Sequence, residues 1–302
     1  MAKKPSKSTL ESVAKRQKSF LLTSVQEDRK NLFTAISDLE ERIVRMAEKR
    51  LEVDGNDQLL GPKVNLKQAQ SIHEDLVREF EKRFGPVARK VTDGYEEIAS
   101  EIRNSWKELD IAVKYTGLDR DMMDTLRTSY YDEFMKFGQA AQKTMIRAMY
   151  DAVAGQSGFA VLADAISAAL TGKRAKNGRP MSTYAKMFAH DATMNFHNSV
   201  TMKKASDAGI DTFLYYGNLM ATSRPFCIER AGKKYTKAEI DGWTFKWKGK
   251  SGPAMTHRGG YNCRHHWMPY RKEWDSALEK ETKSQKPMAA VGRMGKCVMK
   301  NG

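Results

Sequence analysis

Cysteine is scarce in this chain, which has only Cys227, Cys263 and Cys297 among its 302 residues. A low and odd count cannot build a disulfide framework and is typical of a reducing compartment. Long apolar runs are missing too. The patch Phe20-Leu21-Leu22 is too short for the core of a signal peptide, and no run approaches the length of a membrane span. These absences predict a soluble protein that is made in a cytoplasm.

Short motifs of several enzyme classes are also missing. No Gly-x-Ser-x-Gly segment supports a serine hydrolase, and no Cys-x-x-Cys pair supports a standard zinc finger. No internal repeat is visible along the chain. We therefore expect a protein that is not an enzyme.

Positive charge dominates the composition. The 52 Lys and Arg residues outnumber the 37 Asp and Glu residues, which leaves a formal net charge of +15 and a pI near 9.6. The excess gathers at the ends: residues 1–20 hold six Lys or Arg and one Glu, and residues 271–302 hold eight Lys or Arg and four Asp or Glu. A basic balance attracts polyanions, so we expect DNA or an acidic protein surface as a partner.

Apolar residues recur at helical spacing through residues 16–170, which predicts a helical body. Residues 1–15, rich in Lys and Ser, are expected to be a flexible basic N-terminus. Gly and Pro residues divide the body near 54–57, 61–62, 85–86 and 116–117. A first helix ends near Asp54, and further helices are expected over about 65–84, 87–115, 119–153 and 159–170. The last is apolar on most sides, so we expect it to be buried.

Residues 171–180, with the sequence TGKRAKNGRP, form a basic linker and a candidate domain boundary. Residues 181–270 are expected to form a compact domain with a helix over 182–208 capped by Ser182, a strand over 212–216 and an alternating strand over 243–247. Residues 271–302 are expected to hold a short helix near 271–283 and then a loose basic tail. The pattern predicts an α+β protein, with a long, mainly helical N-terminal region and a small mixed C-terminal domain.

Ligand-type side chains cluster in the last part of this domain. They are Cys227, His257, Cys263, His265 and His266. Zinc favours tetrahedral ligation by Cys and His, so Cys227, His257, Cys263 and His265 are a candidate metal site. Alternation within Cys263-Arg264-His265 suits a strand that points both ligands to one side. In the simpler alternative, the cysteines are small buried residues and the histidines contact solvent or DNA. No other cofactor is expected.

Two short segments of this region resemble the signature of a known protein family. Thr222-Ser223-Arg224-Pro225-Phe226-Cys227 is followed by Gly232-Lys233, and His257-Arg258-Gly259-Gly260-Tyr261-Asn262-Cys263-Arg264-His265 is followed by Pro269. This arrangement, over about 182–270, is similar to that of phage minor head proteins of the Mu F-like, or head morphogenesis, family. His265 stands where many members have a second Cys. The resemblance marks as structural motif residues Arg224, Pro225, Cys227, Gly232, Asn262, Cys263, Arg264 and Pro269.

The resemblance implies a structural protein of a tailed-bacteriophage head. Such a protein acts in head morphogenesis and in DNA packaging or ejection near the portal, and it stays inside the capsid of the virion. The implied partners are the portal protein, a capsid or scaffold protein and packaged double-stranded DNA, with no membrane in the assembled head. We expect the segment from Arg224 to Cys227 to pin its strand against the Cys263 strand. In the alternative, Arg224 is an anion clamp or a salt-bridge partner.

Two further hypotheses concern nucleic acid. Aromatic residues alternate with basic ones in this region, and such interleaving can stack bases and hold phosphates. The candidate DNA contacts are Lys246, Lys248, Lys250, Arg258 and Arg264. The same pattern also fits a small β module with an aromatic core and solvated lysines. The alternative function is a metal-dependent nuclease, or another DNA-processing enzyme, that uses His257, Asn262 and His265, although their spacing is compressed into nine residues.

Overall fold

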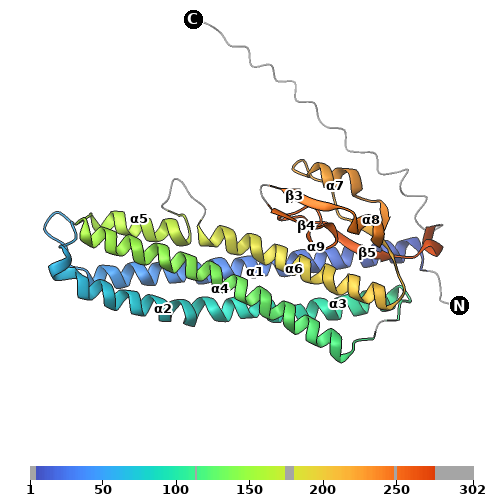
Figure 1. Cartoon of the computed structure of the whole chain (residues 1–302), viewed down its shortest axis with the longest axis horizontal. Coiled ribbons are helices and arrows are strands. Elements are labelled where there is room, and N and C mark those ends of the chain that lie inside the picture. The colour runs from blue at the N-terminus through green and yellow to red at the C-terminus, as the bar shows by residue number, and fades with distance from the viewer. Residues whose placement is uncertain (1–4, 113, 174–179, 248–249, 276–302) are drawn as a thin grey trace, which may run out of the picture.

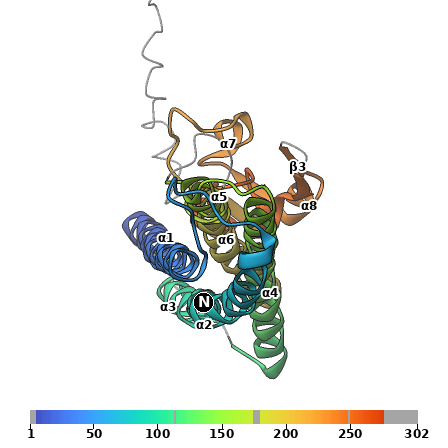
Figure 2. The same ribbon diagram turned by 90° about the vertical axis from the view of Figure 1, so that its left-hand side faces the viewer.

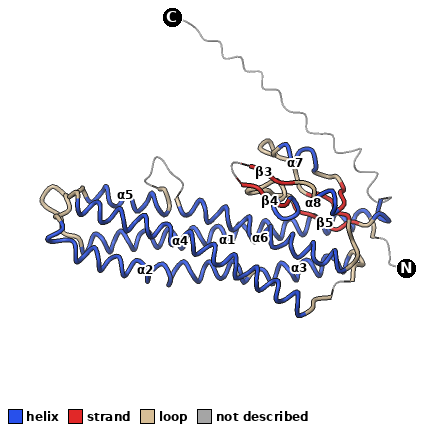
Figure 3. The backbone as a smooth tube through the Cα atoms, viewed as in Figure 1, coloured by secondary structure: helices blue, strands red, loops and turns tan. Residues whose placement is uncertain are grey.

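The computed structural model describes residues 5–112, 114–173, 180–247 and 250–275 of the chain. Long helices lie side by side in an elongated bundle, and a small group of strands and short helices covers one end of it (Figures 1 and 3). This arrangement confirms the predicted α+β class, with helices first and a mixed region last. Within the described residues, no helix is both long and apolar enough to cross a membrane.

Six long helices form the bundle in the described part of the chain. Their bounds are α1 Lys7–Arg50, α2 Pro62–Asp93, α3 Tyr95–Glu108, α4 Gly117–Ala154, α5 Phe159–Leu170 and α6 Met181–Asp207. Figure 2 looks along the bundle from the end where α1 leads into α2, and shows α3 following α2 along the same side.

The start of α1 is more ordered than the sequence suggested. Ser6 caps the helix, since its hydroxyl oxygen accepts a hydrogen bond from the Thr9 backbone nitrogen at 3.1 Å. Leu10, Val13 and Ala14 are buried in the core. The prediction of a flexible segment through residue 15 is therefore wrong, because these early turns bury apolar side chains.

The helix α2 runs through Gly85 and Pro86, where the sequence predicted a break. A proline inside a helix removes one backbone hydrogen bond and clashes with the preceding turn, at a cost of about 3 kcal/mol. Phe84 is fully buried and Val91 nearly so, and burial of each such side chain contributes about 2 kcal/mol. Packing therefore outweighs the local preference, and the helix ends only at Gly94.

The helices α4, α5 and α6 lie close to their predicted ranges, but the helix predicted over 87–115 is wrong, because residues 87–93 continue α2 and α3 ends at Glu108. Thr116 and Asp119 form a capping box at the start of α4. The N-cap of α6 is Pro180 rather than Ser182, whose hydroxyl donates instead to the Thr171 carbonyl oxygen. Only one face of α5 is buried, and Val161 is 60% exposed. The expectation that this helix is buried is therefore confirmed for one face and wrong for the other.

Parts of two predicted segments lie outside the described residues. These are residues 174–179 of the basic linker and residues 276–302 of the tail, which include Cys297. Of the helix expected near 271–283, residues 271–275 are described, and within them Lys272–Trp274 form a single 3-10 turn.

A three-stranded antiparallel sheet with the order β2-β1-β5 is the base of the mixed region. The strands are β1 Thr212–Tyr216, β2 Lys234–Thr236 and β5 His266–Tyr270, and a separate hairpin pairs β3 Thr244–Trp247 with β4 Lys250–Pro253. The short helices are α7 Pro225–Arg230, α8 Lys237–Asp241 and α9 Ala254–His257. The strand predicted at 212–216 is present, and the one predicted at 243–247 begins one residue later.

Two hydrophobic cores follow one another along the bundle. One joins the second half of α1 to α2, α4, α5 and the start of α6. The other joins the first part of α1 and α3 to the rest of α6 and to the sheet. The helix α6 contributes to both, so the predicted boundary at 171–180 does not separate two cores. The sheet shares the second core with α1, α3 and α6, so it packs directly on the bundle.

Asp28 on α1 yields a stability prediction. Burial is the main cause that raises the pKa of its carboxyl group, to about 7, and the nearby Glu27 adds to it. A raised folded-state pKa destabilises the fold as the pH climbs from about 4 to about 7. Asp28→Asn should therefore stabilise the protein by roughly 2 kcal/mol at pH 8 and change little near pH 4, as measured by urea denaturation. Glu48→Gln is the control, because this exposed carboxyl on α1 is not among the groups that raise the pKa of Asp28. An equal gain for Asp28→Asn at both pH values would contradict the prediction.

Candidate metal centre and its supporting loop

The loop between α9 and β5 carries the second half of the motif. Arg224, directly before α7, reaches across to this loop. It donates from Nη1 to the Gly259 carbonyl oxygen at 2.9 Å and from Nη2 to the Tyr261 carbonyl oxygen at 2.6 Å. Pro225 occupies the first position of α7, where its missing N–H costs nothing. Arg224 therefore ties the two motif segments together through backbone carbonyls.

Asn262 sits in this loop with a φ of 55°, a left-handed conformation that Asn adopts more readily than most residues. Its backbone nitrogen donates to Asp191 Oδ1 on α6 at 2.8 Å, and its side-chain oxygen accepts from Arg29 Nη2 on α1 at 2.5 Å. Two helices of the bundle thus hold the turn that presents Cys263.

Cys227 of α7 and Cys263 of the loop meet in the interior. Their sulfur atoms are 3.7 Å apart and both thiols are free. The Tyr215 hydroxyl on β1 lies 3.4 Å from each sulfur, and His265 Nδ1 lies 3.6 Å from the Cys263 sulfur. The ligand atoms of Cys227, Cys263 and His265 all lie within 4.8 Å of one another, and all three residues are buried. This group is a candidate metal centre.

Two glycines make room for the cluster. A Cβ added at Gly259 would lie 2.3 Å from the Cys227 sulfur, and a Cβ added at Gly217 would lie 2.6 Å from His265 Cδ2. On its other side the His265 ring stacks on Tyr215, with centroids 4.9 Å apart and planes within 7°. The absence of a side chain at Gly259 and Gly217 therefore allows the backbone to lie against the Cys227 sulfur and the His265 ring.

Gly232 and Pro269 act on the strands that carry the cluster. Gly232 has a φ of 77°, and its nitrogen donates to the Tyr215 carbonyl oxygen at 2.8 Å, which extends the pairing of β1. Pro269 lies opposite Phe213 on the edge strand β5, where a proline is tolerated.

Replacement of Gly259 by alanine should damage this centre. The new methyl group would overlap the Cys227 sulfur, and relief requires the loop to move. We expect a loss of roughly 2 kcal/mol in the free energy of unfolding, measured by urea denaturation. Gly117→Ala is the control, because a Cβ there meets nothing within 4 Å. Equal stability of the two variants would contradict the packing described.

The two thiols do not ionise alike. The pKa of Cys263 is lowered, first because the Cys227 thiol donates a hydrogen bond to its sulfur, and also through His265 and the charge of Arg258. The same hydrogen bond, together with burial, raises the pKa of Cys227. The geometry therefore favours a thiolate on Cys263.

The structure brings together three of the four predicted metal ligands. His257, the fourth, ends α9 and lies against Gly252, where an added Cβ would be 2.2 Å from its ring, and it is not part of the group. Cys227 lies in a helix, and Cys263 and His265 lie in a loop, because β5 begins only at His266. The predicted pairing of two strands is therefore wrong, although the side chains converge.

His266, the remaining member of the predicted ligand set, is also excluded from the group. Its ring is buried against His197 of α6, with centroids 5.4 Å apart. Burial lowers the pKa of His266 well below its usual range, so the ring is neutral.

Of the three residues of the nuclease hypothesis, Asn262 and His265 line one cavity, whereas His257 lies apart from it. His257 faces β4, whereas His265 packs on Tyr215 beside the sulfurs. Asn262 is held by Asp191 and Arg29.

Of the predicted DNA contacts, Arg258 has another role. It is 1% exposed and donates from Nη1 to Asn195 Oδ1 and to the Thr256 carbonyl oxygen, both at 2.9 Å. Its assignment as a DNA contact is wrong, because a guanidinium at that depth cannot reach a phosphate. Arg264 is exposed. Lys248 and the side chains of Lys246 and Lys250 lie outside the described residues.

Sequence patterns missed the polar interior of α6. This helix buries His190, Asp191, Asn195, His197 and Asn198 as well as its apolar residues. The Asn198 side-chain oxygen accepts a hydrogen bond from the Trp267 backbone nitrogen and so joins α6 to β5. Asp191 joins α6 to the Asn262 loop in the same way. The sequence offered one signal of this interior: polar and apolar residues are mixed on every side of α6, so no side of it is purely polar.

A cavity of about 410 Å³ opens beside the candidate metal centre. Cys227, Cys263 and His265 line it together with Arg29, Arg224 and Arg264. The thiol and imidazole ligands therefore border a basic, water-accessible space.

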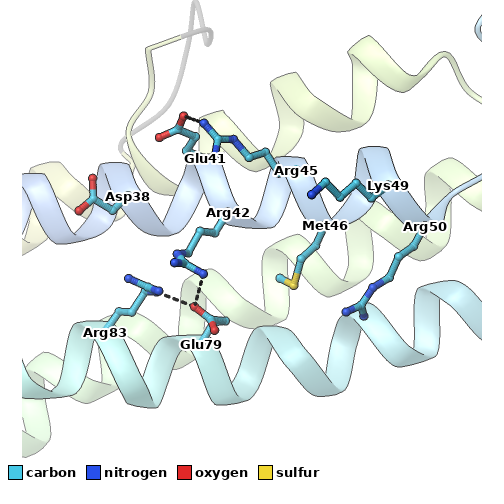
Figure 4. Close-up of a pocket in the computed structure, with 9 residues that line it drawn as sticks. All are labelled: Asp38, Glu41, Arg42, Arg45, Met46, Lys49, Arg50, Glu79 and Arg83. Carbon is cyan, nitrogen blue, oxygen red and sulfur yellow. Dashed lines mark hydrogen bonds and ion pairs between the residues drawn. The ribbon is translucent and has the colours of Figure 1, made fainter.

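A second cavity, of about 520 Å³, lies between α1 and α2 (Figure 4). Arg42 and Arg83 both reach Glu79 there, at 3.8 and 2.5 Å, and Arg45 pairs with Glu41. We interpret this cavity as a solvated network of ion pairs between two helices.

Comparison of the chain with protein-family models, with curated proteins and with solved structures found no match.

Proposed function

We propose that this chain is a structural minor head protein of a tailed bacteriophage, of the Mu F-like kind. It resides inside the capsid near the portal and acts in head morphogenesis and in DNA packaging or ejection. The observation that carries the proposal is the convergence of the motif residues, from segments far apart in the chain, on one buried cluster.

In this proposal the motif has a structural task. Arg224 bonds backbone carbonyls, Asn262 is held by two helices, and the two cysteines are buried. Each of these contacts is made within the protein itself. Hydrogen bonds and buried contacts within the chain are what a motif that maintains the fold requires.

The end of the bundle that lies away from the sheet supports a role in protein contacts. It exposes four large apolar side chains near the connection from α1 to α2 and the start of α5 (Figure 1). They are Val53, Val64, Leu66 and Val161, with exposed fractions between 37% and 60%. Large apolar side chains exposed at one end of the bundle are available for protein contacts, and we assign them to a portal or capsid subunit.

The net charge of +15 supports contact with packaged DNA. Electrostatic binding to phosphates requires no sequence recognition and weakens steeply with salt. We therefore assign the protein a non-specific contact with duplex DNA.

The test is the composition of particles. Heads are purified from a host that carries the gene, treated with protease and nuclease on the outside, and analysed by mass spectrometry. The proposal expects the chain among the protected proteins, at far lower abundance than the major capsid protein. A chain that is abundant in the cells but missing from the particles would overturn it.

Two variants sharpen that test. Leu66→Asp and Val161→Asp should reduce incorporation into heads, while the circular dichroism spectrum stays unchanged. Metal-dependent cleavage of duplex DNA by the purified wild-type chain, lost in His265→Gln, would instead favour the nuclease hypothesis.

A further inference from the structure

We propose that Cys227, Cys263 and His265 bind one zinc ion, through the two sulfur atoms and His265 Nδ1. The fourth ligand is a water molecule in the adjoining cavity. This inference rests on the geometry of the cluster and is independent of the proposed function.

Two of the three distances between the ligand atoms match the edges of a zinc tetrahedron, and the third lies within 4.8 Å. Zinc–sulfur bonds of about 2.3 Å and zinc–nitrogen bonds of about 2.05 Å imply edges of about 3.8 Å between two sulfurs and about 3.5 Å between sulfur and nitrogen. The Cys227 and Cys263 sulfurs are 3.7 Å apart, and Cys263 Sγ lies 3.6 Å from His265 Nδ1. The Cys263 sulfur is thus already spaced from the other two ligand atoms as in a tetrahedral site, and a small approach of Cys227 and His265 would complete it.

The donor set favours zinc over other cations. Calcium and magnesium take oxygen ligands, whereas two thiolates with an imidazole suit zinc. A divalent cation would also balance the charge of the two buried cysteines once both are deprotonated.

The surrounding residues hold the ligands in the way that second-layer residues hold known metal sites. Arg224 fixes the backbone before Cys263, and Tyr215 places its hydroxyl 3.4 Å from both sulfurs. Gly259 leaves the space beside the Cys227 sulfur that a larger residue would fill.

The cavity explains why three protein ligands suffice. All three ligands line it, so one vertex of the tetrahedron faces solvent rather than packed side chains. His257, which the sequence suggested as fourth ligand, lies elsewhere, against Gly252.

Metal analysis of the full chain tests the proposal. Untagged protein is purified under reducing conditions, washed briefly with chelator and analysed by plasma mass spectrometry. We expect about one zinc per chain. His265→Gln should lose most of the metal, whereas His257→Gln, the matched control, should keep it.

A second measurement covers variants that fail to fold. Wild-type protein is stripped with a strong chelator and titrated with Co²⁺. Thiolate-to-cobalt charge-transfer bands and intense d–d bands of a tetrahedral site are expected. Folded, reduced wild-type protein that holds less than about a tenth of an equivalent of zinc and gives no such bands would overturn the proposal. So would retention of full metal content by folded His265→Gln protein.

Discussion

Lys204→Met should lower the free energy of unfolding by about 3–5 kcal/mol at pH 7, because it leaves a buried carboxylate without its cation. Lys204 and Asp119 are each 1% exposed and their charged atoms lie 2.7 Å apart. Lys204 also donates a hydrogen bond to the Lys114 carbonyl oxygen at 2.8 Å. This bond attaches the segment between α3 and α4 to α6. Urea denaturation measures the loss.

Lys203→Met is the matched control at the next position. Lys203 is 33% exposed, and its only contact with Asp119 is at 3.9 Å. An exposed pair contributes up to about 1 kcal/mol, so this variant should stay near wild type. Equal losses in the two variants would contradict the assignment of the buried pair.

The pair also sets a response to acid. Burial alone would raise the pKa of Asp119, but hydrogen bonds from Lys204 and Thr116 outweigh it and lower the pKa to about 2. A depressed pKa contributes stability that is complete above the unfolded value near 4 and is lost as the pH falls toward 2. Wild type should lose about 2 kcal/mol over that interval through this group, and Lys204→Met should lose less.

Arg258→Ala should destabilise the protein by about 3 kcal/mol or more, because it opens a buried space and removes the hydrogen bond that the guanidinium donates to Asn195 Oδ1. The guanidinium bonds α6 to the residues that end α9, and the backbone of Arg258 has a φ of 53°. Thermal and urea denaturation of the variant measure the effect.

Arg264→Ala is the comparison for this arginine. Arg264 is exposed on the rim of the cavity. Its removal should leave stability within about 0.5 kcal/mol of wild type and lower the affinity for duplex DNA, with a smaller dependence on salt. A stable Arg258→Ala protein with weakened DNA binding would reverse the roles given to the two arginines.

Helical spacing was sufficient to predict most of the bundle, since a stripe of apolar residues must face a core. It failed at Pro86, where Gly-Pro is a strong local break but Phe84 is fully buried beside it. It failed again before residue 15, because the many Lys and Ser residues of that segment obscure the short apolar pattern of Leu10, Val13 and Ala14, which are buried. In both places packing with distant segments decided the structure, and no local pattern contains that information.

The candidate site was predicted in its residues but not in its geometry. Cys227, Cys263 and His265 stood out because the chain has so few cysteines and histidines. His257 stood out for the same reason and lies elsewhere, because its direction depends on how α9 ends. Arg29 and Asp191 could not be found, since each acts on Asn262 from a helix remote in the sequence.

A double-mutant cycle on Cys227 and Cys263 tests most directly whether one cluster joins the two motif segments. The free energy of unfolding is measured for wild type, Cys227→Ala, Cys263→Ala and the double variant under reducing conditions. If the two sulfurs act as one unit, the double variant should lose little more than either single variant, with a coupling of at least about 1 kcal/mol. Losses that add within about 0.5 kcal/mol would show that the segments are held independently.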